Sequence, residues 1–311
     1  MARKKIALIG AGNIGGQLAY LIASRELGDV VLLDIPAKEG VAKGKALDIM
    51  QNGGVDDFDC KITGTSDWKE CEGADLLIIT AGIPRKPGQD REDLIGVNLP
   101  IIRNVAENAK KYTPDAMAIV VANPLDAMVY EFKKVTGWSR KRVMGMAGIL
   151  DTSRFSFFLA EAAGVSVKDV RTMVLGGHGD QMVPLIRYST VNGIPVTEFL
   201  SKETIESIVA RTRKGGGEIV KLMGTSAWFA PAAAAIQMAT AIFRDSKRVL
   251  PCAAYLEGEY GYDGLFMGVP VVLGREGVEK VVELPLSAEE KEALAKSADA
   301  VKSVVEICDR S

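Results

Sequence analysis

The chain of 311 residues contains one histidine, His178, in the segment GGHGDQMVP at residues 176–184. An imidazole changes its charge near neutral pH, so it can accept and return a proton during a reaction. Most histidines do no such work, and a helix cap or a loop hydrogen bond is the ordinary alternative. The flanking glycines, Gly177 and Gly179, would leave room for substrate and cofactor to approach the ring. The partners that make His178 a general base must come from elsewhere in the chain.

The segment ILDTSRF at residues 149–155 could supply such partners. Asp151 and Arg154 are three residues apart, so on a helix they share a face. On a surface the pair would be a local ion pair that contributes at most about 1 kcal/mol. The apolar residues around the pair, which include Ile149, Leu150 and Phe155, favour burial instead. A buried aspartate can orient an imidazole and stabilise its cation, and a buried arginine can bind a carboxylate through two N–H groups.

The loop GIPRKPGQDRED at residues 82–93 carries two arginines, Arg85 and Arg91, directly after a predicted strand. Ligands of an open parallel sheet bind beyond the carboxyl ends of its strands, where this loop begins. A solvated charged loop is the ordinary interpretation. A mobile lid that brings arginine onto an anionic substrate is the alternative, and the loop by itself leaves both open.

The segment GAGNIGG has the spacing G-x-G-x-x-G at Gly10, Gly12 and Gly15, between a predicted strand and a predicted helix. In dinucleotide-binding turns the first glycine makes the tight turn, the second lets the backbone approach a pyrophosphate, and the third lets the helix pack on the sheet. Asp34 ends the second predicted strand, where a ribose 2′-hydroxyl acceptor belongs, although a helix cap or turn residue is the alternative. A carboxylate there repels a 2′-phosphate, so NAD is predicted rather than NADP. The predicted cofactor-binding residues of this region are Gly10, Ala11, Gly12, Asn13, Ile14, Gly15 and Asp34.

Short apolar strands and helices alternate through the first half of the chain. Strands are predicted at residues 4–12, 29–35, 74–82 and 117–124, and helices at 13–27, 42–52 and 93–112, the last interrupted at Pro100. Continuous apolar strands separated by helices are typical of a parallel sheet covered on both faces. The predicted fold class is therefore α/β, with a doubly wound parallel sheet of the Rossmann type.

The pattern changes near residue 150, so we predict a domain boundary at 147, with a dinucleotide-binding domain at 1–147 and a substrate domain at 148–311. Helices are predicted at 152–164, 226–243 and 289–308, and strands at 170–177, 268–277 and 278–284. The 226–243 segment is apolar, but Pro231 and Gln237 favour a buried helix over a membrane span. Gly215–Gly217 are predicted to precede a helix and to form a hinge beside the site. They do not form a phosphate loop, because the strand and the Lys-Ser/Thr pair are missing.

Composition excludes several functional classes. The formal net charge is −2, which offers no basic field for nucleic acid or an anionic membrane. Four scattered cysteines without a C-x-x-C pair predict reduced thiols in a cytoplasmic protein. With a single histidine and dispersed cysteines, no metal site is predicted.

Five motifs in this order, GAGNIGG, IITAGIPRKPGQDRED, VANPLD, GILDTSRF and GGHGD, resemble the lactate/malate dehydrogenase family from about residue 4 to 310. The arginine of IPRKPG is similar to the malate enzymes, whereas lactate enzymes generally carry glutamine there. The resemblance is strongest to the malate dehydrogenases that are lactate-dehydrogenase-like in sequence. It implies a Rossmann domain followed by an α/β catalytic domain, NAD as cofactor, a dicarboxylate substrate (malate or oxaloacetate), and a homodimer or homotetramer.

The resemblance also implies a role for each matching residue. His178 would exchange the hydroxyl proton of malate, and Asp151 would accept the other imidazole proton. Arg154 would pair with the carboxylate beside the reacting carbon, Arg85 with the far carboxylate, and Arg91 would polarise the carbonyl oxygen. The further implied contacts are Asn123 and Ser226 for the substrate, and Asn98, Val121, Ala122 and Asn123 for the cofactor.

Two rival functions remain open at this point. One is another NAD-dependent 2-hydroxyacid dehydrogenase, such as a lactate dehydrogenase. Arg85 disfavours it, because a methyl group would leave a buried cation unpaired. The other is a nucleotide sensor that kept the fold and lost the chemistry, which the complete set of Asp151, Arg154 and His178 disfavours.

Overall fold

The computed structural model describes residues 3–84 and 91–310, and for residues 91–93 only the backbone course is described. One sheet runs through the centre of this part of the chain. Its strands are β1 (Lys5–Ile9), β2 (Asp29–Leu33), β3 (Ile62–Thr65), β4 (Leu76–Ile79), β5 (Met117–Val120), β6 (Val143–Gly145), β12 (Arg248–Glu257), β13 (Asp263–Gly274) and β14 (Gly277–Val281). Their order is β14-β13-β12-β6-β5-β4-β1-β2-β3.

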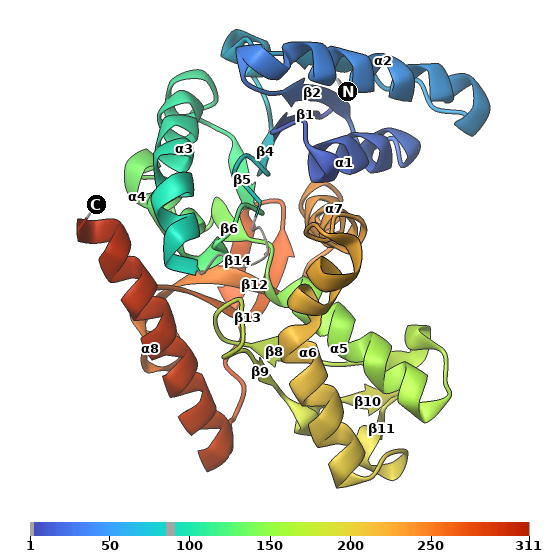
Figure 1. Ribbon diagram of the computed structural model, residues 1–311, viewed down its shortest axis with the longest axis vertical. Coiled ribbons are helices and arrows are strands. Elements are labelled where there is room, and N and C mark those ends of the chain that lie inside the picture. The colour runs from blue at the N-terminus through green and yellow to red at the C-terminus, as the bar shows by residue number, and fades with distance from the viewer. Residues whose placement is uncertain (1–2, 85–90, 311) are drawn as a thin grey trace.

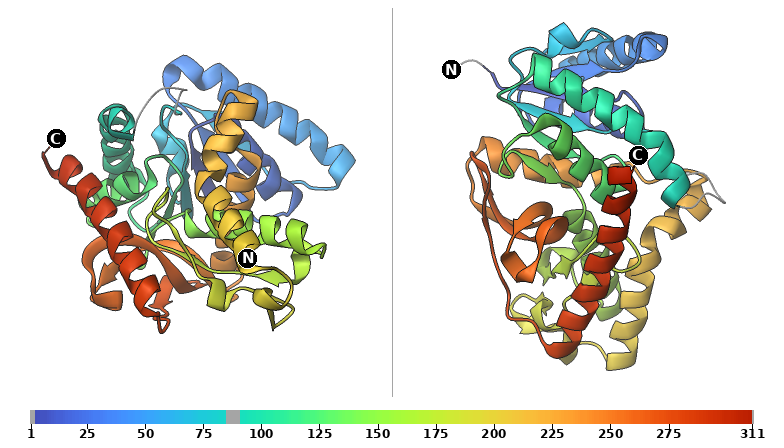
Figure 2. Two further views of the ribbon diagram at one scale, coloured as in Figure 1. Left: turned by 60° about the horizontal axis from the view of Figure 1, so that its bottom comes forward. Right: turned by 90° about the vertical axis from the view of Figure 1, so that its left-hand side faces the viewer.

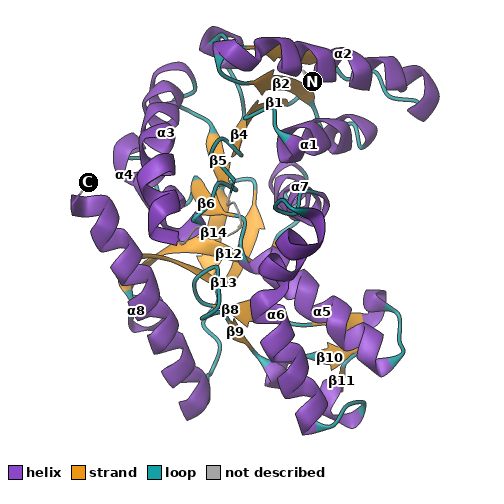
Figure 3. Ribbon diagram, viewed as in Figure 1, coloured by secondary structure: helices purple, strands orange, loops and turns teal. Residues whose placement is uncertain are grey.

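Helices cover both faces of the sheet (Figures 1 and 3). They are α1 (Asn13–Ser24), α2 (Glu39–Asp56), α3 (Arg91–Tyr112), α4 (Leu125–Thr136), α5 (Gly148–Ala163), α6 (Lys202–Met223), α7 (Phe229–Phe243) and α8 (Ala288–Arg310). Short strands follow α5 at β7 (Val170–Arg171), β8 (Val174–Leu175), β9 (Val183–Pro184), β10 (Thr190–Val191) and β11 (Ile194–Pro195). Short 3₁₀ helices are η1 (Pro36–Lys38), η2 (Trp68–Cys71), η3 (Val167–Asp169), η4 (Ile186–Tyr188), η5 (Val196–Glu198) and η6 (Glu259–Gly261).

The strands from β1 to β6 pair in parallel, and β1, β2, β4 and β5 are largely apolar and buried, which confirms the predicted fold class. Successive side chains of a strand point to opposite faces. In β1, Ile6 and Leu8 join a core with α1, α2 and α7, whereas Ala7 and Ile9 join a second core with α3 and α4. Figure 1 shows α1 and α7 on one side of the sheet and α3 and α4 on the other.

The second half of the chain extends the same sheet. β12 pairs antiparallel with β6 where Ala253 lies opposite Gly145, and a Cβ atom at Gly145 would lie only 2.9 Å from the Ala253 Cβ. α7 also crosses back to pack against α1, and α8 runs along the outside of the second half to contact α4 and α3 (Figure 2). The predicted boundary at residue 147 falls between β6 and α5.

Several expectations need correction. The strand predicted at 170–177 is divided into β7 and β8, and α3 continues through Pro100 without interruption. Gly215–Gly217 lie inside α6 and do not precede a helix, because α6 begins at the Ser201 cap and ends at Gly224, which has a φ of +71°.

The helix predicted at 226–243 is present as α7, which begins three residues later, at Phe229, and is largely buried as predicted. Within the described ranges, no helix combines the length and the hydropathy needed to cross a membrane.

Candidate active site

The turn between β1 and α1 has the geometry that the glycine spacing predicts. Gly10 has a φ of +114°, and a Cβ there would lie 2.7 Å from Thr80 Oγ1. At Gly15 a Cβ would lie 1.9 Å from the Gly10 carbonyl oxygen and 3.5 Å from Leu32 of β2. Only glycine fits these two positions, because one needs a left-handed backbone and the other a close contact between helix and strand.

Gly12, by contrast, faces open space, with no atom within 4 Å of a Cβ built on it. It is the N-cap of α1, whose first turn has no side-chain cap and no acidic residue. Unpaired N–H groups and the helix dipole at such an end favour a phosphate group. The turn therefore fits the pyrophosphate of a dinucleotide.

Two charged side chains hold the backbone of this turn at Ala11 and Gly12. Asp34 Oδ2 accepts from Ala11 N at 2.7 Å, whereas Lys45 Nζ donates to the carbonyl oxygens of Ala11 at 2.8 Å and Gly12 at 2.7 Å. Burial lowers the pKa of Lys45, and the Asp34 charge partly opposes that effect. A Cβ at Gly16 would lie 3.1 Å from Lys45 Cδ, so the fourth glycine of the motif leaves room for this lysine.

Sequence reasoning did not find Lys45. It stands within α2, 11 residues beyond Asp34, and no motif marks it. Its role arises because α2 packs beside α1 and β2.

His178 lies in the loop between β8 and β9, and its Nδ1 is 2.8 Å from Asp151 Oδ2. Burial by itself lowers the pKa of His178. The negative charge of Asp151, its hydrogen bond and the charge of Asp126 outweigh burial and the Arg154 cation, so the pKa is raised above 6.5. The imidazole is thus held against a carboxylate that stabilises its protonated form.

Asp151 and Arg154 lie on α5 and form an ion pair, with 3.2 Å between Arg154 Nη1 and Asp151 Oδ1. Their side chains are 2% and 14% exposed, which agrees with the burial that the apolar sequence around them predicts. Asp151 therefore contacts both His178 and Arg154, one through each carboxylate oxygen. The three groups that the sequence singled out are brought together.

The backbone of the His178 loop is held by two residues that sequence reasoning missed. His178 N donates to Asp126 Oδ2 of α4 at 2.9 Å, and Gly177 N donates to Ser297 Oγ of α8 at 2.9 Å. A Cβ at Gly177 would lie 2.6 Å from Val301 Cγ2 and 3.1 Å from Asp126 Oδ2. Gly177 thus allows α8 and α4 to pack against the loop, which corrects the expectation that it leaves room for substrate. The VANPLD motif contains Asp126, but nothing local links Ser297 to the site.

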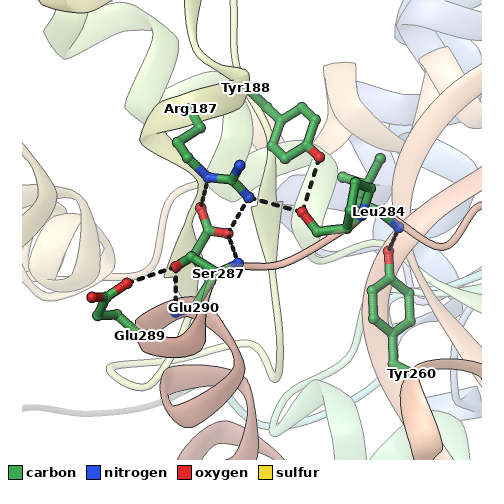
Figure 4. A network of polar contacts seen from close by, with 8 residues as sticks. Arg187, Tyr188, Tyr260, Leu284, Ser287, Glu289 and Glu290 are labelled. Carbon is green, nitrogen blue, oxygen red and sulfur yellow. Dashed lines mark hydrogen bonds and ion pairs between the residues drawn. The ribbon is translucent and has the colours of Figure 1, made fainter.

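A polar network fixes the start of α8 (Figure 4). Ser287 and Glu290 form reciprocal cap hydrogen bonds, and Arg187 donates to both carboxylate oxygens of Glu290, at 3.2 and 2.7 Å. Tyr260 donates to Val282 O and accepts from Leu284 N. Because Arg187 follows β9 closely, this network joins the hairpin that carries His178 to the helix that carries Ser297.

Asn98 of α3 holds two loop ends together at the carboxyl edge of the sheet. Its Nδ2 donates to Asn123 O at 2.7 Å and to Ile83 O at 3.1 Å, and its Oδ1 accepts from Ile83 N. The residue is 1% exposed, so its amide faces these backbone groups. Val121 and Ala122 are buried and donate to Ile79 O, whereas Asn123 is exposed and precedes a cis peptide bond to Pro124.

The remaining predicted residues are placed less fully. Ser226 lies half-buried in the connection between α6 and α7. Arg85 lies outside the described residues, and so does the side chain of Arg91, whose backbone begins α3. Within the described residues, no cluster of three or more His, Cys, Asp or Glu side chains could hold a metal ion.

A dinucleotide-type turn in the first half and an acid–base pair beside a buried arginine in the second define a class of two-part dehydrogenases. The family model for the NAD binding domain of lactate/malate dehydrogenase matches residues 4–145. The model for the lactate/malate dehydrogenase alpha/beta C-terminal domain matches residues 149–309. The chain belongs to the lactate/malate dehydrogenase family.

Relatives of known name support this assignment along the whole chain. The chain is 64% identical to a malate dehydrogenase of Sorangium cellulosum over 309 residues, 99% of each chain. It is 56% identical to a malate dehydrogenase of Myxococcus xanthus over 305 residues, covering 98% of this chain and 97% of the relative.

Solved structures of both family branches have this fold. Malate dehydrogenase from Salinibacter ruber is 50% identical, with a TM-score of 0.94 and 98% of each chain covered. Lactate dehydrogenase from Cryptosporidium parvum, solved with lactic acid and nicotinamide adenine dinucleotide, is 43% identical. Its TM-score is 0.97, with 100% of this chain and 99% of that chain covered. Because both kinds of enzyme match so closely, the fold alone does not separate malate from lactate.

Proposed function

We propose that the protein is an NAD-dependent malate dehydrogenase that interconverts (S)-malate and oxaloacetate. The observation that carries the chemistry is the continuous contact from Arg154 through Asp151 to His178. The observation that favours the dicarboxylate is the sequence identity of 64% and 56% to malate dehydrogenases along nearly the whole chain. Bound NAD would accept a hydride from the hydroxyl carbon of malate.

His178 serves as the general base in oxidation and as the general acid in reduction. Asp151 holds Nδ1, so the other ring nitrogen, Nε2, takes the hydroxyl proton of malate and returns it to oxaloacetate in the reverse direction. The Asp151 charge stabilises the imidazolium that forms. Arg154, already beside Asp151, binds the carboxylate next to the reacting carbon.

The cofactor is held by the turn from Gly10 to Gly15 and by Asp34. Gly12 and the first turn of α1 would hold the pyrophosphate, and the Asp34 carboxylate would accept from the ribose 2′-hydroxyl. Asp34 keeps an acceptor site for that hydroxyl, since each carboxylate oxygen has two lone pairs and the structure gives each one backbone donor. Val121 to Asn123 would line the nicotinamide end, and Asn98 holds Ile83 and Asn123 in place.

The substrate contacts that complete the site come from Arg85, from Arg91 at the start of α3, and from Asn123 and Ser226 in the connections that precede α4 and α7. Arg91 polarises the carbonyl oxygen, Arg85 binds the far carboxylate, and Asn123 and Ser226 add hydrogen bonds. A guanidinium closed over a substrate prefers a dianion strongly, because a methyl group would leave it desolvated and unpaired. These roles rest on the family motifs at these positions.

The unit of 1–147 acts as the NAD-binding domain and 148–311 as the substrate domain. We also propose that the protein is cytoplasmic, that it acts in the tricarboxylic acid cycle, and that it forms a homodimer or homotetramer. Exposed apolar side chains on α2, among them Leu47 at 56% and Val55 at 78% exposure, are suited to contact with a second copy. Light scattering on the purified chain measures the assembly directly.

The test of the reaction is a matrix of NADH or NADPH against oxaloacetate or pyruvate, followed as loss of absorbance by the reduced cofactor. We expect oxaloacetate with NADH to be the preferred pair. Preference for pyruvate would make the protein a lactate-type enzyme, and binding of NADH without turnover of either acid would make it a nucleotide sensor.

Arg85→Gln tests the choice of substrate. We expect it to change the ratio of kcat/KM for oxaloacetate to that for pyruvate by about 10³, since several kcal/mol separate a paired from an unpaired buried cation. The matched control is Lys86→Gln, the neighbouring cation of the same loop. An unchanged ratio in Arg85→Gln would make Arg85 a loop charge and leave the dicarboxylate preference unexplained.

A further inference from the structure

Three consecutive glycines, Gly215, Gly216 and Gly217, stand in the middle of α6. Glycine destabilises a helix interior relative to alanine, so such a run needs a reason. Conformational freedom is not the reason, because none of the three has a positive φ. A hinge before a helix is not the reason either, because the helix continues on both sides.

The three positions differ in what a side chain would meet. A Cβ at Gly215 would lie 3.3 Å from Arg154 Cδ and 3.8 Å from its Nε. A Cβ at Gly216 would lie 3.9 and 4.0 Å from the two terminal guanidinium nitrogens of Arg154. A Cβ at Gly217 would meet nothing within 4 Å. Two of the glycines therefore border the whole outer half of the Arg154 side chain, and the third faces away from it.

Arg154 is confined from the other direction as well. Its Nη1 donates to Asp151 Oδ1 at 3.2 Å, and its side chain is only 14% exposed. Its Nε is buried and has no hydrogen-bond partner within the described residues. The guanidinium thus lies between α5, which holds one end through Asp151, and the bare backbone of α6.

The same helix contacts the loop that carries His178, because Arg213 Nε donates to Met182 O at 3.2 Å. Thr212, one residue before Arg213, is fully buried. Thr212, Gly215 and Gly216 share one face of α6, because residues three and four apart on a helix are neighbours. The helix thus contacts both the arginine and the acid–base loop. A methyl group at Gly215 would press against Arg154 Cδ, so that Arg154 would have to shift. A methyl group at Gly216 would only reach van der Waals contact with the guanidinium, and a larger side chain there would be needed to displace it.

We propose that Gly215 and Gly216 are positioning residues for substrate binding. By presenting no side chain, they let Arg154 lie deep enough to keep its contact with Asp151 while its free N–H groups face the substrate carboxylate. The proposal rests on the proposed function, in which Arg154 binds that carboxylate. It also implies that α6 is less stable than it would be with alanine at these two positions, because the glycines are kept for the placement of Arg154.

The test compares Gly215→Ala, Gly216→Ala and Gly217→Ala. We expect Gly215→Ala to raise KM for oxaloacetate about tenfold, since small misplacements of positioning groups have large effects on rate and binding. Gly216→Ala should have a smaller effect, and Gly217→Ala none. KM for NADH should stay at the wild-type value in all three, and Gly217→Ala should raise Tm by about 1–3 °C.

A second pair of variants tests the proposal even if Gly215→Ala does not fold. Gly216→Val and Gly217→Val change the intrinsic helix propensity by the same amount. Only Gly216→Val places a methyl group against the guanidinium. Several-fold higher KM for oxaloacetate in Gly216→Val than in Gly217→Val supports the proposal. Equal values in this pair, or a wild-type KM in Gly215→Ala, would overturn it. Failure of the proposed function is a separate result, because wild-type protein would then not reduce oxaloacetate.

Discussion

The cofactor turn and the His178 site are built in different ways. The turn at Gly10–Gly15, with Asp34 and Lys45, comes from one stretch of β1, α1, β2 and α2. The His178 site draws its partners from α4, α5 and α8, so that residues from 126 to 297 meet around one loop. The first depends on local backbone geometry, and the second on how distant helices pack.

This difference determines which substitutions each region can tolerate. At the turn, glycine makes contacts that no other residue could make, and two charged side chains hold the backbone at Ala11 and Gly12. At the His178 site, one buried carboxylate connects the imidazole to the arginine, and packing against α8 supports the loop. A change in one region should therefore leave the other nearly intact.

His178→Asn separates the two regions most sharply. Loss of the proton-transfer group should lower kcat by about 10² to 10⁴, while the dissociation constant for NADH stays the same because the turn is in the other half of the chain. Stopped-flow turnover and fluorescence titration with NADH measure the two effects. Near-normal turnover would remove His178 from the mechanism.

Asp151→Asn should lower kcat by about 10² and shift the pH profile. Reduction of oxaloacetate needs the imidazolium, so its rate falls as pH rises through the pKa of His178. Asp151 raises that pKa, so its loss should move the falling limb to lower pH. Profiles of kcat/KM between about pH 5 and 9 measure the shift.

Glu161→Gln is the control for this variant, since Glu161 is an exposed acid near the end of the same helix, α5. Its profile should match wild type. A falling limb at the wild-type pH in Asp151→Asn would mean that another group sets the pH dependence.

Lys45→Met should disturb the cofactor turn and leave the His178 site unchanged. Removing the ammonium takes the side-chain donor from the carbonyl oxygen of Ala11 and leaves that of Gly12 with only the Gly16 N–H, so KM for NADH should rise about tenfold with little change in kcat. Lys43→Met, an exposed lysine of α2 paired with Glu39, should leave KM for NADH unchanged. Equal behaviour of the two variants would reduce Lys45 to a surface charge.

Ser297→Ala tests how far α8 supports the His178 loop, and its effect should be the smallest. Gly177 N would lose its acceptor inside a packed region, which should lower Tm by about 2–6 °C and kcat a few-fold. Ser303→Ala, an exposed serine of α8, is the control and should change neither value. A lower kcat without a lower Tm would give Ser297 a more direct role than loop support.

The parallel sheet, the glycine turn and the pairing of Asp151 with Arg154 could all be predicted from the order of the residues. In each case the determining interactions lie within a few residues: buried strands are apolar throughout, Gly10 and Gly15 serve one turn, and residues three apart share a helix face. The family motifs also predicted that His178 acts together with Asp151, although no local pattern between the two residues indicates that they are in contact.

The groups that surround His178 and Arg154 became known only from the packing of distant helices. Ser297 reaches Gly177 across 120 residues, and α6 borders Arg154 from a position more than 60 residues later in the chain. The glycines illustrate the limit, since Gly177 makes room for α8 and Gly215 makes room for an arginine, and neither serves a turn. A residue that acts by leaving space has no pattern of its own in the sequence, because the group that fills the space comes from another part of the fold.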